Sequence, residues 1–115
     1  MVDNAADPEL VDAARIAELR ELLGEDLREV LSEFLNTAPA HLAVLTTTAT
    51  DPAALIPALH ALRGGAGNIG LVRLAEECRL VEERLRARDA IELDGALRQI
   101  THTFVQTQDV IRRLR

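Results

Sequence analysis

The stretch from His60 to Gly67, which reads His-Ala-Leu-Arg-Gly-Gly-Ala-Gly, combines a nucleophile, a cation and three glycines. An imidazole has an ordinary pKa of about 6.5, so its neutral form is available as a nucleophile near neutral pH. Three residues later, Arg63 supplies a guanidinium, which can hold phosphate oxygens through two parallel hydrogen bonds. These residue types at this spacing point to phosphoryl chemistry on His60.

The three glycines lie in a stretch whose apolar pattern is that of a helix. Glycine in a helix costs about 0.5–1 kcal/mol relative to alanine, and this chain uses alanine freely elsewhere. At 100° per residue, His60 and Gly64 lie roughly 100° or more from the apolar stripe, with Arg63 on its flank. We therefore expect an accessible imidazole on a bare, convex patch that suits a macromolecular partner, whereas a small-molecule enzyme needs a concave pocket. The apolar stripe consists of Leu55, Leu59, Leu62, Ala66 and Ile69.

Helical periodicity dominates the rest of the chain, and no segment alternates with the period of a strand. We predict an all-α fold, an antiparallel up-down-up-down four-helix bundle with an additional short N-terminal helix over one end. Residues 1–115 should form one domain, with 1–7 as a flexible lead, and Pro39 should bend the second helix. The expected helices run from Asp7-Pro8 to about Leu23, from Glu25 to about Thr48, from Asp51-Pro52 to near Gly70, from about Leu74 to Arg88-Asp89, and from about Leu93 to Leu114.

Composition excludes several functional classes. The net charge of −6 over 115 residues argues against nucleic-acid binding, which needs a basic face. Cys78 is the only cysteine of the chain, so a disulfide framework within one chain is impossible, and we expect this residue in the core. No apolar run approaches a membrane span and the N-terminus lacks the features of a signal peptide, so we expect no membrane insertion and a cytoplasmic location.

The stretch after His60 resembles the signature of the histidine-containing phosphotransfer (HPt) family. That signature reads roughly His-x-Leu-Lys-Gly-Ser-Ser/Ala, followed by Gly, Leu, Cys and Leu-Glu at fixed intervals. Two departures occur, because Arg63 stands where the family usually has lysine and Gly65 stands where it usually has serine; the chain contains no lysine anywhere. The matching residues are His60, Leu62, Arg63, Gly64, Gly65, Ala66, Gly70, Leu74, Cys78 and Val81-Glu82, with Leu23 to Leu27, Phe34-Leu35 and Ala38-Pro39 upstream.

The resemblance implies a role for each matched position. His60 would carry the phosphoryl group on its outer ring nitrogen, and Arg63 would offset the incoming charge. Gly64, which has no side chain, would let the partner's active site approach His60. Glu82 either accepts a hydrogen bond from the other ring nitrogen, which would fix the tautomer, or is a solvated surface carboxylate. We place the remaining binding contacts at Gly67, Arg79, Arg86 and Ile56.

The function that the resemblance implies is relay of a phosphoryl group between His60 and aspartates of response-regulator receiver domains, in a multistep two-component phosphorelay. A hybrid sensor histidine kinase would be a further partner, and this chain would be either a free protein or the C-terminal domain of such a membrane-bound kinase. We expect a monomeric phosphocarrier rather than a stand-alone kinase, with no cofactor or metal of its own, because Mg²⁺ belongs to the receiver. From His60 to Arg88, six arginines face four acidic residues, a balance that favours an acidic partner surface.

Three other classes remain open. A non-catalytic helical bundle could bind a receiver or kinase domain without transferring phosphate, although retention of His60 weighs against it. A small helical enzyme could use His60 and Glu82 as an acid–base pair, but the glycines give that class no support. A dimeric coiled-coil adaptor predicts association that depends on concentration.

Overall fold

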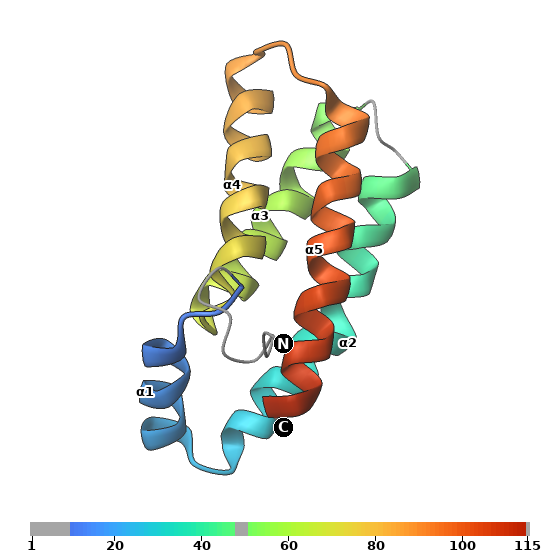
Figure 1. Ribbon diagram of the computed structural model, residues 1–115. Helices are drawn as coiled ribbons and strands as arrows, with labels where there is room; N and C mark the ends of the chain where they lie inside the picture. Colours follow the sequence, from blue (N-terminus) through green and yellow to red (C-terminus); the bar gives the residue numbers. More distant parts are fainter. Residues whose placement is uncertain (1–9, 48–50, 115) are drawn as a thin grey trace, which may run out of the picture.

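A computed structural model describes residues 10–47 and 51–114, and within these ranges it contains five α-helices and no strand. The helices are α1 (Ala13–Leu23), α2 (Asp26–Thr47), α3 (Pro52–Asn68), α4 (Val72–Ala87) and α5 (Leu93–Leu114) (Figure 1). The all-α class is confirmed, and the predicted ends of the last four helices agree with the structure to within about two residues. None of these helices, over the residues described, is long and apolar enough to cross a membrane.

The first helix begins later than predicted. Residues 10–12 are not helical, so the expected continuous helix from Asp7-Pro8 is wrong; positions 7 and 8 themselves, and the expected flexible lead of residues 1–7, lie outside the described residues. The capping residue is Asp12, whose Oδ1 accepts the backbone N–H of Arg15 at 3.2 Å. Tertiary contacts select this start, because Leu10 and Val11 are buried and the Asp12 N–H donates to the carbonyl of Gly70 at 2.8 Å.

Apolar faces of α2, α3, α4 and α5 build most of the core. Helix α3 packs most extensively against α4 and also against α2, while α5 packs against α4 and α2 (Figure 1). Helix α2 continues through Pro39 from Asp26 to Thr47. Cys78 is fully buried, and this burial raises the pKa of its thiol to about 12, as expected of a core residue rather than a reactive one. The fully buried side chains include Leu31, Leu45, Leu55, Leu59, Leu62, Leu74, Ile100 and Ile111.

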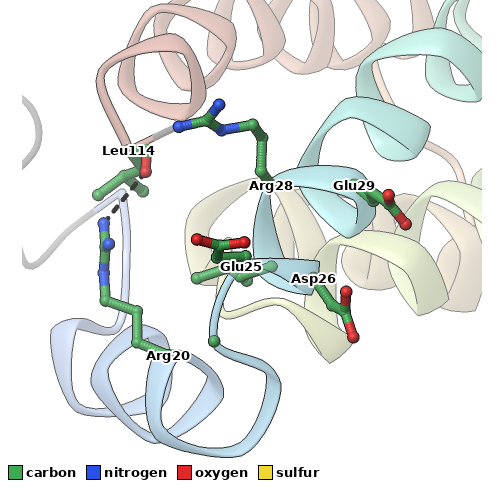
Figure 2. Close-up of a pocket in the computed structure, with 8 residues that line it drawn as sticks. Arg20, Glu25, Asp26, Arg28, Glu29 and Leu114 are labelled. Atoms are coloured by element: carbon green, nitrogen blue, oxygen red, sulfur yellow. Dashed lines mark hydrogen bonds between the residues drawn. The ribbon is translucent and has the colours of Figure 1, made fainter.

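Helix α1 is fastened at one end of the molecule by two arginines. Arg20 donates through Nη2 to the carbonyl of Leu114 at 3.1 Å, which ties the first helix to the last (Figure 2). Arg15 donates through Nε and Nη2 to the carbonyl of Asn68 at the end of α3, each at 3.2 Å. A hollow beside Arg20 is lined by residues 24–29 and Leu114, and none of the predicted site residues reaches it.

Gly70 makes the tight turn between α3 and α4 possible. Its φ of +80° is a conformation that favours glycine, and it places the N–H of Leu71 on the carbonyl of Ala66 at 2.9 Å. A Cβ at Gly70 would lie 3.2 Å from both Cβ and Cγ of Arg15. The turn therefore needs glycine both for its backbone and for the close approach of α1.

We predict that Gly70→Ala lowers the free energy of unfolding by at least about 1–2 kcal/mol, the cost of a left-handed alanine. Gly64→Ala is the control, because Gly64 lies inside α3 without a positive φ and a Cβ there would meet nothing within 4 Å. Urea unfolding should show a loss for Gly70→Ala and none for Gly64→Ala. Equal stabilities of Gly70→Ala and the wild type would contradict the need for glycine in this turn.

Candidate functional site

His60 lies in the middle of α3 and presents its ring to solvent. Its side chain is 65% exposed, whereas the neighbouring Leu59 and Leu62 are fully buried. The ring nitrogen Nδ1 lies 3.1 Å from Oε2 of Glu82 on α4. With Glu82 ionised, Nδ1 is the donor in this contact, and in the neutral ring Nε2 then carries the free lone pair.

Glu82 is a buried carboxylate that receives three donors. Its side chain is only 2% exposed. Of the two alternatives for Glu82 in the sequence analysis, the solvated surface carboxylate is therefore wrong. Besides His60, it accepts Nη1 of Arg63 on Oε1 at 3.3 Å and Nε of Arg86 on Oε2 at 2.9 Å. A buried charge is tolerated when it is paired and hydrogen-bonded in this way. Burial alone would raise the pKa of Glu82, but the hydrogen bonds from Arg86, Arg63 and His60 outweigh it and lower the pKa.

Arg63 and Arg86 bring positive charge from two helices to the same carboxylate. Their side chains are 39% and 56% exposed, and each contact with Glu82 uses one nitrogen of a guanidinium that has five N–H donors. The sequence placed Arg63 at the site for its charge, but it did not reveal that Arg63 and Arg86 meet on Glu82. The four-residue spacing of Glu82 and Arg86 on one predicted helix was the sequence feature that could have indicated their ion pair.

The glycines beside His60 leave part of α3 bare. A Cβ at Gly64 would meet nothing within 4 Å, and one at Gly67 would just touch Cβ of Ala75 at 4.0 Å. Gly65 differs, because its Cβ would lie 3.4 Å from the ring of Phe34. Packing within the described structure therefore does not require glycine at positions 64 and 67, and these positions lie exposed on the helix that carries His60.

The last two predicted site residues lie in different surroundings. Ile56 is half-buried one turn before His60, in a groove that Arg86 also lines. Arg79 instead donates through Nε to Glu76 and through Nη1 to Glu83, both at 2.8 Å, and these hydrogen bonds raise its pKa. The structure thus brings His60, Arg63, Glu82 and Arg86 together, with Ile56 beside them, and holds Arg79 in a separate ion-pair cluster on α4.

We predict that Gly64→Ala raises the free energy of unfolding by about 0.5–1 kcal/mol, because alanine is the better helix former and its methyl group meets no neighbour. Gly65→Ala should gain less, since its methyl group presses on Phe34. Thermal or urea unfolding measures both variants. A loss of stability in Gly64→Ala would show that the fold itself needs this glycine.

The lowered pKa of Glu82 predicts a pH dependence of stability. Ionised Glu82 stabilises the native state above its ordinary pKa of 4.5, and this contribution is lost as the pH falls through the lower native pKa. The stability difference between the wild type and Glu82→Gln should therefore shrink from about pH 5 to about pH 3. Glu33→Gln, at an exposed position on α2, controls for the loss of one charge. A difference that is constant over this range would contradict the buried ion cluster.

Comparison with known proteins agrees with this geometry. The family model of the Hpt domain matches residues 29–115. The crystal structure of histidine-containing phosphotransfer protein B (HptB) from Pseudomonas aeruginosa PAO1 is similar, with 25% identity and a TM-score of 0.85 over 94% of this chain and 95% of that one. No curated protein matches the chain. On the family match and the shared fold, the chain belongs to the histidine-containing phosphotransfer (Hpt) domain family, whose members relay phosphoryl groups with response regulators.

Proposed function

We propose that His60 accepts a phosphoryl group on Nε2 from an aspartyl phosphate of a receiver domain and later returns it to another receiver aspartate. As an Hpt domain, the chain is a histidine phosphotransfer module of a phosphorelay. The observation that carries the assignment of His60 is its exposed ring, which is held at Nδ1 by a buried carboxylate. This leaves Nε2 as the nitrogen that can attack.

The proposed step needs no proton transfer to or from the attacking nitrogen. The lone pair of Nε2 forms the N–P bond while the P–O bond to the receiver aspartate breaks, and that aspartate leaves as a carboxylate. The ring then carries a positive charge with the proton still on Nδ1, where Glu82 stabilises it. Arg63 and Arg86 can offset the phosphoryl charge with guanidinium N–H groups that do not bond Glu82.

Helices α2 to α5 would form an antiparallel up-down-up-down bundle, supported by their short connections and by the packing of α3 on α4 and of α5 on α2. Residues 1–115 would act as one monomeric domain in the cytoplasm. A hybrid sensor histidine kinase would supply a phosphorylated receiver domain. The module itself would bind no cofactor, because the receiver holds the Mg²⁺ that assists the transfer.

The test is phosphoryl transfer from a panel of receiver domains, each first labelled on its aspartate. We expect at least one receiver to label the wild-type chain with an acid-labile, base-stable phosphoryl group, and we expect His60→Gln to take up no label. His102→Gln is the matched control, because it removes an exposed histidine on α5 and should be labelled like the wild type. Labelling of His60→Gln to the wild-type extent would refute the assignment. Binding of a receiver without any transfer would favour the non-catalytic interaction module.

A further inference from the structure

Arg88, at the end of α4, has an unusual backbone conformation. Its φ of 59° and ψ of 31° are left-handed, and within residues 10–47 and 51–114 it is the only residue other than glycine with a positive φ. Its N–H donates to Leu85 at 3.2 Å, and that of Asp89 donates to Arg84 at 2.9 Å. These two bonds form the helix ending in which the left-handed position is usually glycine.

The same chain uses glycine where this ending occurs on α3. There Gly70 takes the left-handed position, and the equivalent hydrogen bonds run from Gly70 to Gly67 and from Leu71 to Ala66. A side chain in this conformation crowds the backbone, so Arg88 carries strain that glycine would relieve. The Arg88 side chain is exposed, and core packing therefore does not explain its presence. Backbone strain of this kind clusters at functional sites of proteins.

The Arg88 side chain lines a groove between the start of α3 and the end of α4. Four apolar residues supply much of the lining, and two arginines outnumber one carboxylate in it. The groove is continuous with the phosphotransfer site, because Arg86 lines it and also bonds Glu82, the partner of His60. The lining residues are Pro52, Ala53, Ile56, Leu85, Arg86, Arg88 and Asp89.

We propose that this groove is a docking contact for the receiver domain and that Arg88 strengthens the docking. The occupant would be an apolar side chain of the receiver with a carboxylate beside it, the apolar group lying on Ile56 and Leu85 and the carboxylate pairing with Arg88. This inference rests on the proposed function, since a receiver that brings its aspartate to His60 also covers the preceding turn of α3. Because Arg86 is paired with Glu82, Arg88 is the cation of this groove that would complement a carboxylate of the receiver.

The test measures transfer from the phosphorylated receiver domain that labels His60 fastest in the panel. Arg88→Gly should unfold at an equal or higher urea concentration than the wild type, yet raise KM for the receiver about tenfold with kcat little changed. Arg88→Asn should give the same rise in KM, because asparagine tolerates the left-handed conformation but lacks the charge. Arg84→Ala is the matched control, because it removes an arginine from the same helix outside this groove, and its KM should be that of the wild type.

A second donor separates docking from chemistry. Phosphoramidate transfers its phosphoryl group directly to imidazole with loss of ammonia and needs no docking surface, so it should label the wild type and Arg88→Gly equally. A KM for Arg88→Gly within twofold of the wild type would overturn the docking proposal while leaving His60 as the acceptor. Failure of both donors to label the wild type would instead remove the proposed function, and this inference with it.

Discussion

The site depends on one buried carboxylate. Glu82 lies out of reach of water, so it is stable as an anion only while donors surround it, and these come from His60 and Arg63 on α3 and from Arg86 on its own helix α4. The same contacts hold the imidazole by Nδ1 and gather two guanidinium groups beside it. The packing of α3 on α4, the most extensive in the described structure, and the tight turn at Gly70 set the distance between the ring and this carboxylate.

A buried carboxylate that holds the imidazole, next to a surface with few side chains, suits transfer between macromolecules. In the proposed mechanism, the contact of Nδ1 with Glu82 leaves Nε2 as the attacking atom, and the lack of a side chain at Gly64 would let a partner approach the ring. Helix α1 adds support from a distance, because Arg15 bonds the end of the helix that carries His60. The candidate site therefore lies on α3 and α4, and the other helices pack against these two in the core.

The apolar spacing predicted α2 to α5 well, because long amphipathic patterns report directly on which face is buried. The predicted start of α1 at Asp7-Pro8 was wrong because tertiary contacts hold residues 10–12 outside the helix: Leu10 and Val11 are buried, and the Asp12 N–H donates to the carbonyl of Gly70. Within the site, the glycine pattern indicated His60, but the partnership with Glu82 came from the family resemblance, since 22 residues separate the pair. Arg79 was predicted as a binding contact; in the structure its side chain bonds the carboxylates of Glu76 and Glu83 on its own helix, apart from the cluster around Glu82.

The most direct measurement of the central claim is ¹⁵N NMR of the His60 ring before and after phosphorylation, in a sample labelled at histidine. Before transfer, the neutral ring should carry its proton on Nδ1, bonded to Glu82, with Nε2 unprotonated. After transfer, a coupling between ³¹P and ¹⁵N should appear at Nε2 while the proton stays on Nδ1. A ring protonated on Nε2 in the resting state, or a phosphoryl group on Nδ1, would contradict the role of the buried carboxylate.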